Sequence, residues 1–93
     1  MKLFEYINRI NLLDKLIREK RTGTPEMLAE RLSLSVSRLY VVLDELKHRG
    51  APIKYSRQAQ TYFYKEPFEI SIKADFTPLS NNVVVDINDL NFD

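Results

Sequence analysis

The stretch Thr24-Pro25-Glu26-Met27-Leu28-Ala29-Glu30-Arg31-Leu32 decides the fold, together with a longer run from Ser35 to Arg49 that closes on Gly50. A threonine followed by proline is typical of a helix start, because the hydroxyl caps the helix and proline has no N–H to satisfy. A serine starts the longer run in the same way, and the glycine at its end is typical of a helix stop. The pattern therefore predicts two helices joined by a tight turn.

The longer run, residues 35–49, has an apolar side and a mixed outer side. On a helical wheel the apolar side centres on Leu39, with Leu43 and Leu46 beside it and Val36 and Val42 at its borders. The outer side carries Ser37, Val41, Asp44 and His48, flanked by Arg38, Tyr40 and Glu45. We expect the apolar side to face the core and the outer side to be open to a partner.

Another helix is predicted before this pair, over residues 3–20. Its apolar stripe consists of Leu3, Tyr6, Ile7, Ile10, Leu13 and Ile17. Leu16 lies beside the stripe and is expected to widen the core. Leu12 lies nearly opposite the stripe, where it could form either a further core contact or a dimer seam. Gly23 predicts that this helix ends near Thr22-Gly23.

Two short segments rich in β-forming residues follow, at 53–56 and 61–65. The loop Arg57-Gln58-Ala59-Gln60 between them has no glycine, which disfavours a two-residue turn and predicts a hairpin with a longer loop. Residues 69–76 partly alternate and could form another strand, and Val83-Val84-Val85-Asp86-Ile87 is β-like. The predicted class is α+β: three helices, a β-hairpin and a β-like C-terminal extension.

Composition limits the size of the fold and its setting. The 93 residues, 44% of them hydrophobic, suffice for one small core but not for a buried catalytic cavity as well. Residues 1–66 carry 13 Lys and Arg against 8 Asp and Glu, whereas residues 67–93 carry one lysine against five acidic residues. We therefore predict a basic domain over 1–66 and an acidic extension over 67–93, which could add a strand or contact a second copy.

The sequence contains no cysteine, no apolar run of membrane-spanning length and no signal-peptide pattern at its start. These features predict a protein without disulfide bonds or membrane spans, located in the cytoplasm.

From about Ile10 to Tyr64 the chain resembles winged helix-turn-helix domains, namely those of DeoR-type and WYL-type bacterial regulators and the biotin-repressor-like winged helices. The resemblance rests on Leu28-Ala29-Glu30-Arg31-Leu32, Leu34-Ser35, the leucines at 39, 43 and 46, and Gly50-Ala51-Pro52-Ile53. It implies that residues 35–49 form a recognition helix and residues 53–65 a wing. It further implies a transcriptional regulator that binds double-stranded DNA, with a homodimer doubling the footprint.

The resemblance also implies which side chains contact DNA. In the major groove these would be Val36, Ser37, Tyr40 and Val41, with Arg38 close by. At the tip of the wing they would be Arg57, Gln58 and Gln60. Near the second helix Arg21 and Thr24 would meet phosphates.

Two departures from the family pattern support a rival interpretation. Family members usually carry several cations on the outer face of the recognition helix, where this chain has few, and a glycine at the wing tip, where it has none. The rival is a winged helix that docks a protein partner through Val36, Tyr40 and Val41. A third possibility is a small structural accessory protein without a sequence-specific target.

Catalysis and metal binding have no basis in the sequence. The adjacent carboxylates Asp44 and Glu45 diverge on a helix, and two glycines cannot form a glycine-rich phosphate loop. His48 is the single histidine, has no ligand partner at metal-binding spacing, and is better explained as a complement to the helix dipole. We therefore expect no enzyme activity, no metal and no cofactor.

Overall fold

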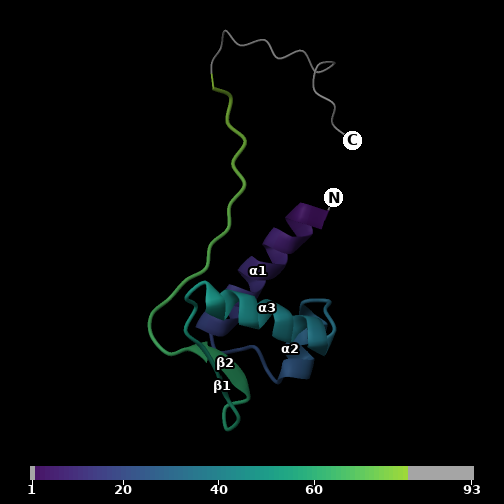
Figure 1. The fold of residues 1–93 in the computed structure, drawn as a ribbon, viewed down its shortest axis with the longest axis vertical. Helices are drawn as coiled ribbons and strands as arrows, with labels where there is room; N and C mark the ends of the chain where they lie inside the picture. The colour runs from purple at the N-terminus through teal and green to yellow at the C-terminus, as the bar shows by residue number, and fades with distance from the viewer. Residues whose placement is uncertain (1, 80–93) are drawn as a thin grey trace.

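A computed structural model of the chain describes residues 2–79 and has the predicted α+β architecture (Figure 1). Three helices precede a two-stranded antiparallel hairpin, which is the layout of a winged helix. The elements are α1 (Lys2–Arg18), α2 (Pro25–Arg31), α3 (Val36–His48), β1 (Ile53–Ser56) and β2 (Thr61–Tyr64). The two predicted N-caps are confirmed, because the Thr24 and Ser35 hydroxyls accept backbone N–H groups of the helices they begin.

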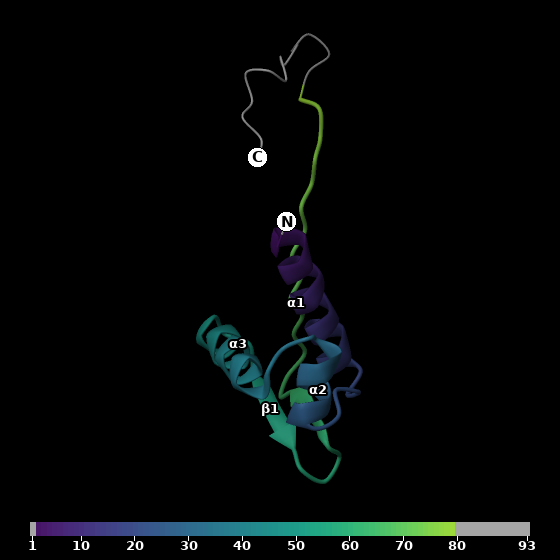
Figure 2. The same cartoon turned by 90° about the vertical axis from the view of Figure 1, so that its right-hand side faces the viewer.

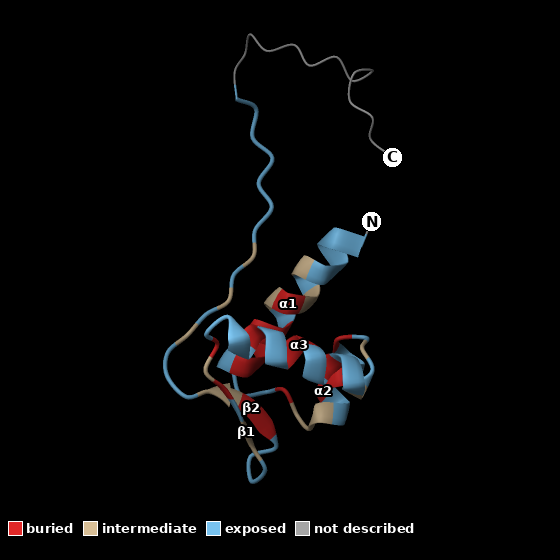
Figure 3. Cartoon of the chain, viewed as in Figure 1, coloured by how far each residue is buried: buried red, intermediate tan, exposed pale blue. Residues whose placement is uncertain are grey.

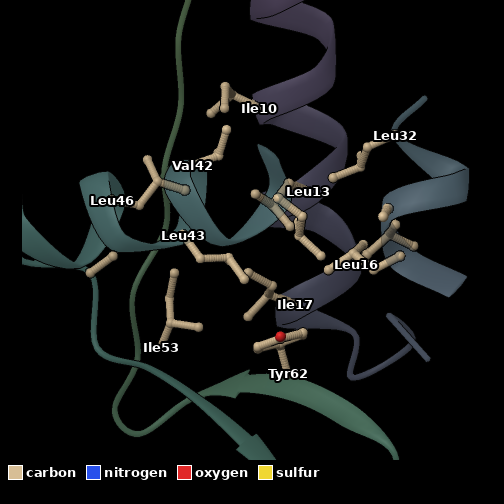
Figure 4. Packing of buried hydrophobic residues seen from close by; sticks show 14 residues of the cluster. Ile10, Leu13, Leu16, Ile17, Leu32, Val42, Leu43, Leu46, Ile53 and Tyr62 are labelled. Atoms are coloured by element: carbon tan, nitrogen blue, oxygen red, sulfur yellow. The ribbon is translucent and has the colours of Figure 1, made fainter. Parts of the chain in front are cut away.

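One hydrophobic core lies between the three helices and the inner face of the hairpin (Figures 3 and 4). α1 contributes Ile10, Leu13 and Ile17 from the predicted stripe, and Leu16 widens the core as expected. The other elements contribute Leu28, Ala29, Leu32, Leu39, Val42, Leu43, Leu46, Ala51, Ile53 and Tyr62. The predicted burial of Leu3 and Tyr6 is wrong, because the first turns of α1 extend past α2 and α3 and no described part of the chain buries them.

The predicted end of α1 near Thr22-Gly23 is also wrong. The helix ends at Arg18, and Lys20 takes the left-handed conformation (φ 55°) that glycine usually supplies. The Arg21 N–H donates to the Leu16 carbonyl at 2.9 Å and the Lys20 N–H to the Ile17 carbonyl at 3.1 Å, which is a Schellman ending. Lysine is not a residue type that marks a helix end, so the sequence pattern could not predict that α1 ends here.

Replacing Lys20 by glycine is expected to stabilise the protein by about 0.5–1 kcal/mol, because glycine adopts the left-handed conformation without the steric cost of a Cβ. The free energy of unfolding in urea measures the effect. Lys20→Ala is the matched control, since it removes the same side chain but keeps the Cβ. Equal stability of the two variants would contradict the assignment of strain to this residue.

The connection between α1 and α2 runs along the outer edge of β2. The buried Thr22 donates its N–H to Thr61 Oγ1 at 3.2 Å, and its own Oγ1 accepts the Tyr62 N–H at 2.8 Å. The two hydroxyls lie 3.1 Å apart. Gly23, at φ 74°, then turns the chain into α2, where an added Cβ would crowd the Met27 side chain. A pair of threonines therefore fixes the position of the hairpin relative to the helices.

The hairpin has the longer loop that the missing glycine predicts. Ser56 pairs with Thr61, and the four residues between them form the turn. The Ala59 N–H donates to Ser56 Oγ at 3.1 Å, and Gln60 takes the left-handed conformation at φ 52°. The hydrogen bond to the Ser56 side chain and the left-handed backbone of Gln60 together close the turn without a glycine.

Residues 68–76, here called the strap, run antiparallel to α1 (Figure 2). The Ile72 N–H donates to Asn11 Oδ1 at 3.1 Å, and Asn11 Nδ2 donates to the Ile72 carbonyl at 2.9 Å. Phe68, Ile70 and Ile72 pack against the core. The strand expected at 69–76 is therefore an extended segment that pairs with side chains of a helix and joins no sheet. The β-like segment Val83–Ile87 lies outside the described residues.

Candidate nucleic-acid interface

The first two turns of α3 present the side chains expected to read DNA. Ser35 Oγ accepts the Arg38 N–H at 3.0 Å, which fixes the start of the helix. Ser37 and Arg38 are exposed, and Tyr40 and Val41 keep 48% and 52% of their surface open to solvent. This outer surface is free because Leu39 and Leu43 on the opposite side are buried in the core.

Val36 occupies a different environment from these four. It is half-buried and packs against the core, as its place at the border of the apolar side allows. It marks the edge of the exposed surface rather than its centre.

The hairpin turn presents three more of the predicted contacts. Arg57, Gln58 and Gln60 are all exposed. The turn projects from the end of the molecule opposite to the N-terminal end of α1 (Figure 1). These side chains can therefore reach a partner without rearrangement of the core.

The cations of this surface are available to an anion. In the part of the chain that the structure describes, no carboxylate forms an ion pair with Arg38, Lys54 or Arg57. At the far end of α3, by contrast, Arg49 lies 3.8 Å from Glu45. Exposed pairs of that kind contribute little to stability, but they reduce the charge that a phosphate would meet.

The two phosphate contacts expected near the second helix differ in their surroundings. Thr24 Oγ1 accepts the Met27 N–H at 3.2 Å, so this hydroxyl caps α2. Arg21 Nη1 lies 3.6 Å from Glu19, and the carbonyl of Arg21 accepts a hydrogen bond from Arg31. Arg21 also lines a shallow groove between α1 and the C-terminal end of α2, together with Leu12 and Lys15.

Tyrosines occupy the junction between α3 and the hairpin. The rings of Tyr55 and Tyr62 pack with centroids 4.8 Å apart. Burial, with smaller contributions from the neighbouring phenols of Tyr40 and Tyr55 and the carboxylate of Glu26, raises the pKa of Tyr62 to about 12. These groups come from α2, α3 and both strands, so this junction brings together every element of the predicted interface. Tyr55 belongs to it, although the sequence pattern did not single it out.

The second half of α3 has a different character. Asp44 and Glu45 are exposed there, and His48 Nδ1 donates to the Asp44 carbonyl at 2.9 Å. The ring thus bonds to a carbonyl in the last turn of the helix, in agreement with a helix-end role for this histidine. Acidic side chains in this half leave the first two turns as the part of α3 suited to a polyanion.

Asp14 is the residue that sequence reasoning missed. It is buried on α1, where Oδ2 accepts from Arg18 Nε at 2.7 Å and Oδ1 accepts from Tyr64 Oη at 2.8 Å and from the Ile70 N–H at 2.9 Å. Burial and the bond to Asp14 raise the pKa of Tyr64. The available signal was a single carboxylate between two core residues of the apolar stripe.

The described part of the chain lacks the features of two other protein classes. None of its helices has the length and apolar character needed to cross a membrane. Nowhere between residues 2 and 79 do three His, Cys, Asp or Glu side chains gather closely enough to hold a metal ion.

No protein-family model, no curated protein and no solved structure matches this chain. The interpretation of the interface therefore depends on the geometry and chemistry of its own residues.

Proposed function

We propose that the protein binds double-stranded DNA and acts as a transcriptional regulator, with the first two turns of α3 in the major groove and the hairpin turn on the neighbouring backbone. The observation that carries the proposal is the set of exposed side chains on these two elements, which includes two arginines without a carboxylate partner in the described residues. A helix of this length fits the major groove, and its N-terminal residues are the ones that contact base edges in helix-turn-helix proteins.

The chemistry of the individual side chains supports this assignment. Arg38 and Arg57 can neutralise phosphates or bond to guanine, and Ser37 and Tyr40 carry hydroxyls that can donate to a phosphate oxygen. Val41 can contact a thymine methyl group. With so few cations, affinity for DNA is expected to be modest and to fall steeply as salt concentration rises.

Replacing Arg38 by glutamine is expected to weaken binding to a mixed-sequence duplex of about three helical turns by roughly tenfold. The lost phosphate contact should also lower the slope of log affinity against log salt by about one. Fluorescence anisotropy over a salt series measures both quantities. Arg57→Gln should show the same pattern.

Lys73→Gln is the matched control, because it removes one exposed cation from the strap, away from α3 and the hairpin. It should leave the affinity within about twofold of the original value. If both arginine variants bind as tightly as the unmodified protein, the groove assignment is wrong.

The exposed aromatic and aliphatic surface of α3 favours one alternative, in which Tyr40 and Val41 dock a protein partner. Asp44 and Glu45 beside them would then contribute to the rim of that interface. The same salt series separates the two functions, since apolar docking responds weakly to ionic strength whereas phosphate binding responds strongly.

A further inference from the structure

The shallow groove between α1 and the C-terminal end of α2 has an apolar floor that the core leaves open. Leu12 keeps 40% of its surface exposed there, and Leu16 lies beside it at the margin of the core. The groove has a volume of about 310 Å³ and is open to solvent along its length. A segment of extended chain can therefore cover Leu12 without any change to the core.

Cations surround this floor. Lys15, Arg21 and Arg31 line the groove, and of the described residues that line it only Glu19 is acidic. Glu19 lies 3.6 Å from Arg21, whereas no described carboxylate forms an ion pair with Lys15 or Arg31. Arg31 Nη1 donates to the Arg21 carbonyl at 3.0 Å, which holds this guanidinium at the groove and leaves its other N–H donors to a ligand. The groove suits a ligand that carries both carboxylates and aliphatic side chains.

The chain contains such a segment. Residues 80–93, here called the tail, include no lysine or arginine and three aspartates, at 86, 89 and 93. Their apolar residues are Val83, Val84, Val85, Ile87, Leu90 and Phe92. Alternate residues of an extended chain share one side, so a tail bound in that form presents Val85 and Ile87 first and Asp89 next on the same side. This order matches the groove, in which Leu12 precedes Lys15 and Arg21.

The tail is long enough to reach the groove. The strap runs antiparallel to α1 and brings Phe76 beside Phe4, with ring centroids 6.1 Å apart (Figure 2). Leu12 lies eight residues further along α1 than Phe4, which is about 12 Å at 1.5 Å per residue. The eleven residues from Phe76 to Ile87 span up to about 36 Å when extended, so the chain can reverse direction and still reach Leu12.

The groove is also close to the strap around the circumference of α1. Asn11, which bonds to the strap, is followed directly by Leu12, so the two side chains lie about 100° apart on the helix. The hairpin turn, by contrast, projects from the end of the molecule opposite to the N-terminal end of α1 (Figure 1). Of these two basic surfaces, the groove is the nearer to the end of the strap.

We propose that residues 83–93 dock into the α1–α2 groove of the same chain, with Ile87 on Leu12 and the following aspartates beside Lys15 and Arg31. Because the tail is tethered to the strap, its effective concentration at the groove is high, and contacts that are weak individually suffice to hold it. The groove includes no residue of α3 or of the hairpin, so the proposal does not depend on what those elements bind.

A spin label on the tail tests the location. The sequence has no cysteine, so Asn88→Cys provides a single attachment point, on the side of an extended tail opposite to Ile87 and Asp89. In the full chain, paramagnetic broadening of the amide signals should be strongest for residues 12–19 of α1 and weak for the hairpin turn. A mixture of spin-labelled chain with isotope-enriched unlabelled chain should show no broadening, because the contact lies within one molecule.

Two substitutions on the same helix make the test specific. Leu12→Glu puts a carboxylate on the floor of the groove and should lower the broadening of the α1 amides by at least about threefold. Tyr6→Glu is the matched control, because Tyr6 has nearly the same exposure, 41%, but lies about 120° around α1 from Leu12. It should leave the broadening unchanged. If circular dichroism shows that Leu12→Glu does not fold, Lys15→Glu carries the same expectation.

Three results would overturn the proposal. Broadening that is uniform, or strongest at the start of α3 and the hairpin turn, would show that the tail does not select the groove. Broadening in the mixed sample would show that the tail contacts a second copy. Unchanged broadening in both Leu12→Glu and Lys15→Glu would exclude the groove residues as the binding site.

Discussion

Asp14→Ala should lower the free energy of unfolding by about 3–5 kcal/mol, which is a large part of the stability of a small domain. The carboxylate accepts bonds from Arg18, from Tyr64 and from the Ile70 N–H, and it does so from a buried position. Alanine would leave the Tyr64 hydroxyl and the Ile70 N–H without an acceptor, and hydrogen bonds to a charged group contribute about 1.5–3 kcal/mol each. Urea unfolding measures the total.

Amide hydrogen exchange gives a more specific readout of the same variant. Loss of Asp14 should release the strap, so the Ile70 and Ile72 amides should lose protection before the core amides of α3 do. Asp44→Ala, which removes an exposed carboxylate, is the control and should change stability by less than about 0.5 kcal/mol. A loss below about 1 kcal/mol in Asp14→Ala, with Ile70 still protected, would show that this carboxylate does not anchor the strap.

Thr22→Val should cost about 2–3 kcal/mol even though valine has nearly the same shape as threonine. The Thr22 hydroxyl accepts the Tyr62 N–H at 2.8 Å and donates to the Gly23 carbonyl at 2.9 Å. Valine would leave the Tyr62 N–H buried and unpaired, and it would place a methyl group against the Thr61 hydroxyl. Thermal and urea unfolding should agree on the loss.

Two comparisons make the Thr22 result interpretable. Thr22→Ser keeps the hydroxyl and should recover most of the stability. Thr77→Val makes the same chemical change at an exposed position of the chain and should have little effect. A large loss in the serine variant together with little loss in the valine variant would show that packing of the methyl group, and not the hydrogen bond, is what matters at this site.

Local signals were sufficient for the framework of the fold. Thr24 and Ser35 act as the expected caps, Gly50 ends α3 with φ 103°, and the glycine-free loop of the hairpin has the expected length. Each of these depends on residues within one helical turn or one β-turn of each other, where residue type and backbone conformation are directly linked. The exposed outer face of α3 follows from the same periodicity.

The remaining features depend on contacts between distant parts of the chain. Nothing near Lys20 in the sequence marks it as the end of α1, because its conformation is imposed by packing of the chain that follows. In the sequence nothing distinguishes Asn11 and Asp14 from other polar residues of a helix. Their role follows only from their hydrogen bonds to the strap. Leu3 and Tyr6 are exposed because α2 and α3 end before they reach the first turns of α1. A helical wheel describes α1 alone and cannot predict where the neighbouring helices end. For the interface, periodicity indicated which side chains are exposed but not that Tyr55 packs against Tyr62 between the strands.

The strap also affects the order in which a growing chain can fold. The buried carboxylate of α1 finds its partners 50 and 56 residues later, and the amide before it pairs 61 residues later. During synthesis α1 therefore emerges with an acidic group in its apolar stripe that has only Arg18 of the same helix as a partner, and closing such long loops is slow. The first helix can complete its packing only after the hairpin and the strap have left the ribosome, so a stalled nascent chain exposes an unfinished core.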